Sequence, residues 1–408
     1  NFCKTKNMEP AKKESFFSGL TKNTFLLALT SLFSDISSEM LYPILPIFLT
    51  QTLKVSGSIV GLIEGVAGTT QNIVQGFSGS LSDKWQKRKG IAVFGYILSA
   101  ISKPFMGLAM AWPMVFGARF LDRFGAGTRA APRDALIAAS ADEKNRGKAF
   151  GLEGAGDNLG AFIGPLIAVA LLFMWEFNIR SVFYLAFIPG VLSVIMILLV
   201  KEKRVDVKSK IKIDVGLKQF PTGYRKYLLA TALFGIGNSS NAFLILQTKD
   251  MGVSFENTIL IYAVFNLLAA AISYPAGHLS DKYGRKNILL ISFLIFLITY
   301  CGFAFTKNLW VIGSLFCLYG LYQGVFRSVG KAMAADFIPA QLRASGIGWY
   351  STTIGITGLI ASVVAGQLWD HVSHSSVFIF GAVFSLIGII SLIILIPNKK
   401  ANEFAIAS

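Results

Sequence analysis

Twelve apolar runs follow one another along this chain, each about 20 residues long, the length that crosses the hydrocarbon core of a bilayer as an α-helix. Only a helix or a closed barrel satisfies its own backbone hydrogen bonds at that depth, and the runs lack the two-residue alternation of barrel strands. The sequence therefore predicts an all-α membrane protein with twelve transmembrane helices. The runs lie near residues 25–49, 56–80, 90–111, 112–138, 149–173, 181–200, 226–248, 257–279, 288–306, 309–337, 344–368 and 376–396.

The composition excludes most other classes of protein. Hydrophobic residues make up 53% of the chain, charged residues only 15%, and the mean hydropathy is +0.59. A soluble domain has about 25% charged residues, so a soluble enzyme, a disordered chain and a disulfide scaffold are excluded. The three cysteines and three histidines are scattered, and no phosphate-binding Walker sequence occurs. We therefore expect no metal site, no cofactor and no enzymatic activity.

The basic residues predict how the chain is oriented. Its net charge is +16. The two tails and every second connection hold 27 Lys and Arg residues, whereas the other connections hold four. By the positive-inside rule, this bias predicts that both termini lie in the cytoplasm. The expected location of the protein is the cell (inner) membrane. The charge is thus a topology signal, and we expect no binding of nucleic acid.

The longest polar stretch separates the sixth run from the seventh, which indicates a linker between two six-helix halves. The predicted organisation is a cytoplasmic tail at 1–24, a first half at 25–200, a cytoplasmic linker at 201–225, a second half at 226–396 and a second tail at 397–408.

The two halves look like copies of one another. The stretch GSLSDKWQKRK begins at Gly79 and GHLSDKYGRKN at Gly277, an offset of 198 residues that also carries Arg129 to Arg327. Because six runs separate the copies, both have the same orientation in the membrane. Parallel repeats of this kind place a substrate site between the halves, near the middle of the bilayer.

The second copy, GHLSDKYGRK, matches the signature loop of the major facilitator superfamily, G-x-L-x-D-[RK]-x-G-[RK]-[RK], at every position. The chain therefore resembles this superfamily, and the layout of twelve runs extends the resemblance over essentially its whole length. The first copy departs at Gln86, where the family has glycine. The resemblance implies that the loop closes the cytoplasmic side, with its Asp facing a helix N-terminus in the opposite half. The residues carried over to this gate are Gly79, Asp83, Arg88, Gly277, Asp281, Gly284 and Arg285.

The fifth run contains a glycine pattern that is similar to that of proton-coupled antiporters and efflux members of the superfamily. Its matching residues are Gly151, Gly160, Gly164 and Pro165, and Ala168 replaces a further glycine. Gly160 and Gly164 lie one helical turn apart, so another helix can approach closely. A plain helix-packing face therefore explains the pattern as well as antiport does.

The fourth run carries charges at three- and four-residue spacing, which places Arg119, Asp122 and Arg133 on one helix face. Charges inside a membrane normally face a cavity and have a partner. One interpretation is a cationic stripe that attracts an anionic substrate. The other is a charge-paired gate, with Asp134, Asp336, Glu153 and Asp157 as partners. The candidates for the substrate cavity are Arg119, Arg123, Arg129, Arg133, Arg327, Lys331, Asn238 and Asn241.

Carboxylates inside the runs are the candidates for proton coupling. Asp35 and Glu39 lie one turn apart in the first run, and two carboxylates so close in a low dielectric do not easily both ionise. Glu64 and Asp122 are further candidates. The alternative is that Asp35 or Glu39 merely forms an ion pair with Arg119 or Arg123.

Together with the resemblance, these features predict a secondary active transporter that moves a small organic molecule by alternating access. We expect proton coupling and, from the glycine pattern, export by antiport. The alternative is import of an anionic metabolite or a polycarboxylate siderophore. An alternative of another class is a non-transporting receptor or a lipid-handling protein on the same fold. The expected partners are the substrate, protons and the lipid bilayer, and the expected state is a monomer.

Overall fold

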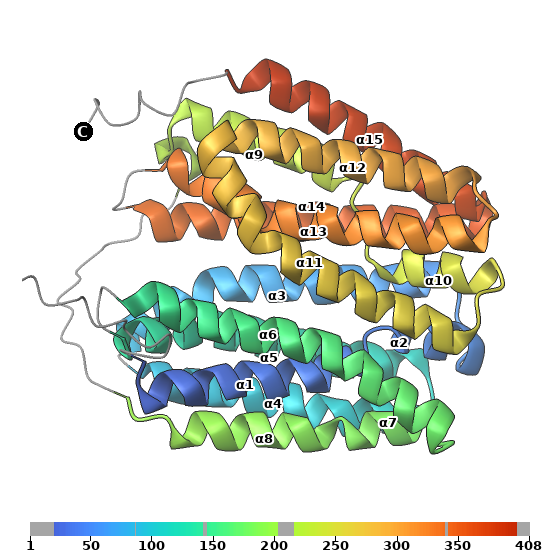
Figure 1. The fold of residues 1–408 in the computed structure, drawn as a ribbon, viewed down its shortest axis with the longest axis horizontal. Coiled ribbons are helices and arrows are strands. Elements are labelled where there is room, and N and C mark those ends of the chain that lie inside the picture. The colour runs from blue at the N-terminus through green and yellow to red at the C-terminus, as the bar shows by residue number, and fades with distance from the viewer. Residues whose placement is uncertain (1–19, 86, 142–144, 203–215, 339–341, 398–408) are drawn as a thin grey trace, which may run out of the picture.

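The computed structural model describes residues 20–85, 87–141, 145–202, 216–338 and 342–397, and they form an α-helical bundle (Figure 1). The start of the first helix and the end of the last lie at the same end of the bundle. We call this end, which also carries the signature loop, the basic end, and the other the opposite end.

Each of the twelve predicted runs corresponds to one helix or to consecutive shorter ones. The first half contains α1 (Lys22–Glu39), α2 (Leu45–Ile47), η1 (Phe48–Thr52), α3 (Gly57–Trp85), α4 (Arg88–Leu108), α5 (Trp112–Ala139), α6 (Arg146–Val169), η3 (Ala170–Met174), α7 (Ile179–Leu185) and α8 (Phe187–Leu199). The second contains η4 (Leu217–Gln219), α9 (Thr222–Gly235), α10 (Ala242–Asp250), α11 (Phe255–Tyr283), α12 (Arg285–Phe305), α13 (Leu309–Asp336), α14 (Arg343–His371) and α15 (His374–Leu395).

Two of the predicted runs are interrupted by breaks of several residues, whereas the sixth is interrupted only at Ala186, between α7 and α8. The first is interrupted between α1 and α2, and the seventh between α9 and α10, where residues 236–241 are non-helical. Taken one by one, eight helices of the described chain are long and apolar enough to cross a membrane. The long helices α3 and α5 are not among them, because they carry polar and charged side chains. Polar residues and broken helices thus concentrate in the interior of the bundle.

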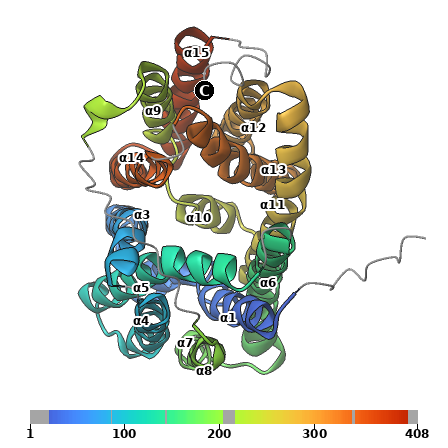
Figure 2. The same ribbon diagram turned by 90° about the vertical axis from the view of Figure 1, so that its left-hand side faces the viewer.

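Within the halves, α1 packs on α6, α4 on α5, α11 on α13, and α12 on α15. The halves meet along two seams, formed by α3 with α14 and by α6 with α11. Figure 2 shows the halves on either side of these seams, with α10 between them. The twofold arrangement of the helices follows the sequence repeat.

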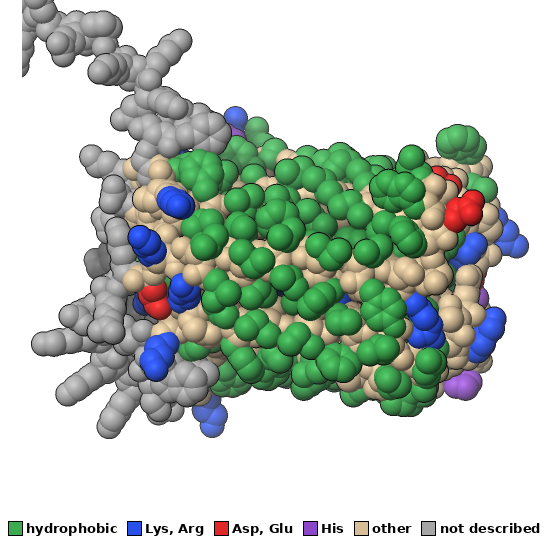
Figure 3. Space-filling view, turned by 90° about the horizontal axis from the view of Figure 1, so that it is seen from below, with side chains coloured by type: hydrophobic (Ala, Val, Ile, Leu, Met, Phe, Trp, Pro, Cys, Tyr) green, Lys and Arg blue, Asp and Glu red, His purple; other side chains and the backbone are tan. Residues whose placement is uncertain are grey.

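A broad apolar surface surrounds the bundle. Figure 3 shows hydrophobic side chains over the middle of one face, with charged side chains at both ends. Large apolar residues in the middle of the helices, such as Leu267, Ile298 and Leu386, are exposed. A patch of this size is not stable in water, and the hydrocarbon core of a bilayer covers it.

The glycines of α6 allow close contact with α1. A Cβ atom on Gly160 would lie 2.5 Å from the carbonyl oxygen of Leu32, and one on Gly164 2.9 Å from that of Ile36. A Cβ on Gly151, in contrast, would meet no described atom within 4 Å. The glycine pattern therefore packs α6 on α1 through two of its three glycines.

Gly160→Ala is expected to destabilise the protein by about 1–3 kcal/mol, because the added methyl group forces α1 away from α6. Gly151→Ala is the matched control, since both changes bring the same gain in helix propensity. The measurement is thermal unfolding of the purified variants in one detergent. Equal stability of the two variants would show that the α1–α6 contact tolerates a methyl group.

Candidate functional site

A cavity of about 250 Å³ lies between the halves, and both halves line it. The first half contributes Tyr42, Glu64, Gly65, Gly68, Thr69, Gln71, Asn72, Arg119 and Arg123. The second contributes Gly235, Asn238, Ser239, Ser240, Asn241, Gln323, Phe326, Arg327, Ile354, Gly355, Gly358 and Ser362. The non-helical segment after α9 thus forms part of the wall, as expected for irregular backbone inside a membrane protein.

A buried ionic network forms the wall on the side of the first half. The Arg119 guanidinium donates two hydrogen bonds to the Glu64 carboxylate, at 2.9 and 3.0 Å, and one to Asp122 at 3.2 Å. The Lys103 ammonium donates to Asp122 at 2.7 Å and to Ser38 at 3.2 Å. All four charged groups are buried, and burial of this kind is tolerated only when charges are paired. The network joins α1, α3, α4 and α5.

The sequence analysis missed Lys103. It lies in the apolar run 90–111, which by composition alone reads as an ordinary lipid-facing span. A lone ammonium in the middle of such a run was the available signal, because it requires an anionic partner. Asp122 of α5 is that partner.

Arg123 and Arg327 reach the cavity from opposite halves. Arg123 donates from Nη1 to Gln71 at 3.1 Å, and its Nε lies 3.4 Å from Asp122. Its buried Nη2 has no hydrogen-bond partner in the described part of the chain. Arg327 is exposed at the cavity and makes no hydrogen bond or ion pair with any described residue. These two guanidinium groups are therefore available to a ligand.

The two carboxylates of α1 have different surroundings. Glu39 accepts hydrogen bonds from the Tyr262 hydroxyl at 3.0 Å and from Asn266 at 3.3 Å, both on α11 of the second half. Asp35 packs instead against Gly160 of α6, in its own half. Neither forms an ion pair with Arg119 or Arg123 among the described residues, and Arg119 is held by Glu64.

The remaining residues of the stripe do not line the cavity. The Arg129 guanidinium lies over the Tyr96 ring, 4.4 Å from its centroid. Arg133 forms ion pairs with Glu153 at 2.9 Å, with Asp134 at 3.0 Å and with Asp157 at 4.0 Å, three of the expected partners. Lys331 is exposed, one turn beyond Arg327 towards the basic end. Asn238 lines the cavity, as does Asn241, whose side-chain oxygen accepts from the Tyr319 hydroxyl.

The expected anionic partner on α13, Asp336, contacts the signature loop. It pairs with Arg285 at 2.6 Å, and Arg285 also lies 3.4 Å from Asp281. Gly284 has φ +89°, a conformation that favours glycine in a tight reversal. The ion pair of Asp281 with Arg285 lies within its own half, whereas the resemblance implies that Asp281 faces a helix N-terminus of the other half.

The first copy of the loop is described only in part. Gln86 and the side chain of Asp83 lie outside the described residues, and of Gly79 only the helical backbone is described. The backbone N–H of Arg88 donates to the Glu202 carboxylate at 2.8 Å, which satisfies one free donor at the start of α4.

The opposite end of the bundle is closed by contacts between the halves. Both oxygens of the Asp370 carboxylate accept from backbone N–H groups at the start of α3, those of Gly57 and Ser58, each at 2.8 Å. Asp370 thus caps a helix of the other half, where the helix dipole favours an anion. Beside it, Trp369 stacks on His374. The sequence analysis missed Asp370, since nothing in the sequence places α14 beside α3.

Asp370→Asn is expected to weaken this closure by about 1 kcal/mol, or roughly fivefold in the population of the closed form, because the capping charge is lost. Double electron–electron resonance between spin labels at positions 54 and 372, in a cysteine-free background, measures the opening. Glu176→Gln, in a loop at the same end, is the charge-matched control. Identical distance distributions in wild type and Asp370→Asn would contradict a closing role.

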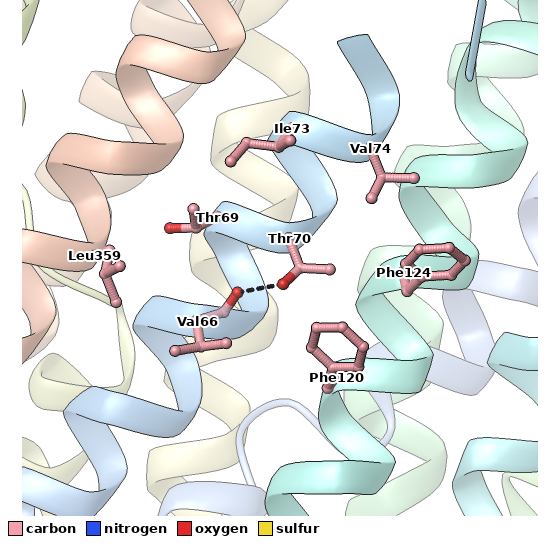
Figure 4. A pocket seen from close by; sticks show the side chains of 8 residues that line it. All are labelled: Val66, Thr69, Thr70, Ile73, Val74, Phe120, Phe124 and Leu359. Carbon is pink, nitrogen blue, oxygen red and sulfur yellow. Dashed lines mark hydrogen bonds between the residues drawn. The ribbon is translucent and has the colours of Figure 1, made fainter. Parts of the chain in front are cut away.

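A second cavity of about 250 Å³, which we call the apolar crevice, is lined mostly by hydrophobic side chains (Figure 4). Its lining consists of Val66, Thr69, Thr70, Ile73, Val74, Phe120, Phe124 and Leu359, from α3, α5 and α14. Only Thr69 lines both this crevice and the inter-half cavity. The crevice has no charged side chain in its lining, so the polar cavity is the better candidate site.

Two repeated six-helix halves around a polar cavity define a secondary transporter. The sequence pattern described as Major Facilitator Superfamily matches residues 27–226 and again 227–406, so the chain belongs to this superfamily. The predicted family and the all-α membrane fold are therefore confirmed, and the protein is a multi-pass membrane transporter rather than an enzyme.

Similar proteins agree with this assignment. The chain is 36% identical over 376 residues to the uncharacterized MFS-type transporter MJ1317 of Methanocaldococcus jannaschii, covering 90% of this chain and 93% of that protein. It is 29% identical over 159 residues to the quinolone resistance protein NorA of Staphylococcus aureus, which covers 39% of this chain and 41% of that protein. The crystal structure of the nucleoside transporter NupG has the same fold, with a TM-score of 0.75 at 15% identity, over 93% of this chain and 100% of that one.

Proposed function

We propose that this transporter binds a small organic molecule in the inter-half cavity and couples its movement to protons. The halves would be residues 25–200 and 226–396, joined by the linker 201–225, and would act as a monomer. We place the basic end in the cytoplasm of a cell with the protein in its inner membrane, because 27 Lys and Arg residues lie in the tails and connections at that end against four at the other.

The observation that carries proton coupling is the position of Glu39. Its carboxylate bridges α1 and α11, on opposite sides of the α6–α11 seam, through Tyr262 and Asn266. Hydrogen bonds to an ionised carboxylate are about twice as strong as those to a neutral group. Protonation of Glu39 would therefore weaken a contact between the halves, which links a proton to alternating access. Asp35, Glu64 and Asp122 remain further candidates, although Glu64 and Asp122 are already held by buried cations.

Two directions of transport follow from different observations. Export by antiport is supported by the glycine pattern of α6 and by the partial similarity to the quinolone resistance protein NorA. Import of an anionic molecule together with a proton is supported by the arginines of the cavity, because a bound anion and a bound proton compensate each other's charge. In both cases, the state that is closed at the opposite end is the one in which substrate enters or leaves the cavity from the basic end.

The test is reconstitution into liposomes that contain a pH-sensitive dye. Addition of a transported compound is expected to cause proton flux. The protons move in the direction opposite to the compound for antiport and in the same direction for symport. Substrate movement without any proton movement would overturn the coupling. Saturable binding of a lipid without substrate movement would favour the lipid-handling alternative.

A further inference from the structure

The charge of the cavity lining is unbalanced. Three arginines line it, Arg119, Arg123 and Arg327, and Glu64 is the one carboxylate among the lining residues. Glu64 is fully engaged, since both of its oxygens accept from Arg119. Arg119 is likewise engaged by Glu64 and Asp122. The positive charge left to the cavity is therefore that of Arg123 and Arg327.

Arg123 has donors left over after its contacts with the protein. Asp122 lies 3.4 Å from its Nε, but the same carboxylate also serves Lys103 and Arg119. Its Nη2 is buried without a partner in the described ranges. A buried guanidinium donor without an acceptor costs free energy, which a bound anion would recover.

Arg327 faces the same cavity from α13 of the other half. The sequence repeat relates Arg327 to Arg129, but Arg129 stacks on Tyr96 and does not line the cavity. The tertiary structure thus places Arg327 in the lining of the same cavity as Arg123, a residue at a different register of α5.

We infer that the substrate is a small organic anion, a carboxylate or phosphate, held between Arg123 of the first half and Arg327 of the second. This inference rests on the proposed function of the cavity. Guanidinium groups bind both kinds of anion through paired N–H donors. The volume of about 250 Å³ limits the ligand to a small molecule.

The same arrangement explains how binding would promote transport. A ligand shifts a conformational equilibrium only through contacts that differ between the states. An anion that contacts both arginines favours the state in which they approach each other, and they belong to different halves. Side-chain amides of Gln71, Asn72 and Gln323 in the lining are available for other polar groups of the ligand.

The test uses full-length protein in nanodiscs and isothermal calorimetry. The anionic probes are succinate, citrate, phenyl phosphate and inorganic phosphate; the neutral ones are succinamide and benzyl alcohol, and the cationic one is tetramethylammonium. At least one anion is expected to bind, whereas its neutral counterpart does not. Arg123→Gln and Arg327→Gln should each weaken that binding about 10- to 100-fold, the effect of losing a charged hydrogen bond. Arg225→Gln, on the exposed start of α9, is the control with the same charge change.

Carboxylates and phosphates are told apart by which probe binds. Binding of neutral or cationic probes alone, or no anion binding up to on the order of 10 mM, would overturn the inference. Retained affinity in both cavity variants would overturn it as well, because the anion would then bind elsewhere. Failure of the proposed coupling has a different signature: the anion binds with the expected dependence on the arginines, but its transport moves no protons.

Discussion

Glu39→Gln is expected to abolish accumulation driven by a pH gradient while exchange of substrate across the membrane continues. Glutamine has nearly the same size and retains an oxygen that accepts from Tyr262, but it cannot carry a proton. With one proton per substrate, one unit of pH gradient supports about tenfold accumulation, and the variant should approach a ratio of about one. The measurement follows radiolabelled uptake of the bound anion into liposomes, with and without the gradient.

Glu256→Gln is the matched control for this experiment, since it makes the same change at an exposed position in the first turn of α11. Asp35→Asn is measured alongside, because Asp35 is the neighbouring carboxylate on α1. Full accumulation in Glu39→Gln would show that Glu39 carries no proton, and loss in Asp35→Asn alone would move the coupling site to Asp35. Loss of exchange together with accumulation in Glu39→Gln would assign Glu39 to substrate contact instead.

Asp122→Asn is expected to reduce the free energy of unfolding by about 3–5 kcal/mol, the usual cost of breaking a buried ion pair by removing one partner. Asp122 lies 2.7 Å from Lys103, 3.2 Å from Arg119 and 3.4 Å from Arg123. Its removal leaves three buried or half-buried cations facing one carboxylate, that of Glu64. Denaturant titration in detergent measures the loss.

The double variant Lys103→Met, Asp122→Asn should recover part of this loss, because the unpaired ammonium is removed together with its partner. Arg119 keeps Glu64 in both variants, and both lack Asp122, so the comparison isolates the cost of leaving the Lys103 ammonium unpaired. A cost of less than about 1 kcal/mol for Asp122→Asn would mean that the pair is solvated like a surface ion pair. Equal losses of unfolding free energy in the single and double variants would show that the unpaired Lys103 ammonium does not destabilise the protein.

The sequence by itself determined the features that depend on local chemistry. A bilayer leaves a chain few ways to satisfy its backbone, so apolar runs of sufficient length had to become helices. Gly284 in the signature loop adopts φ +89°, a conformation that glycine reaches without a steric penalty. The repeat and the loop together identified the superfamily, since both can be recognised from short stretches of sequence. The breaks after α1 and after α9 were not predicted, although each contains a residue that disfavours a helix, Pro43 in the first and Gly237 in the second.

Only the tertiary structure decided which charges meet. Glu39 and Tyr262 are 223 residues apart, and Asp370 and Gly57 are 313 apart. Helical spacing placed the charges of α5 on one face, but it did not determine that Arg123 reaches the cavity while Arg129 stacks on Tyr96. Side chains a few residues apart on one helix can face a cavity or a neighbouring helix, depending on how that helix is rotated in the bundle. That rotation is set by packing between helices, such as the contact of α6 glycines with α1, so it follows from the assembled fold and not from any single segment.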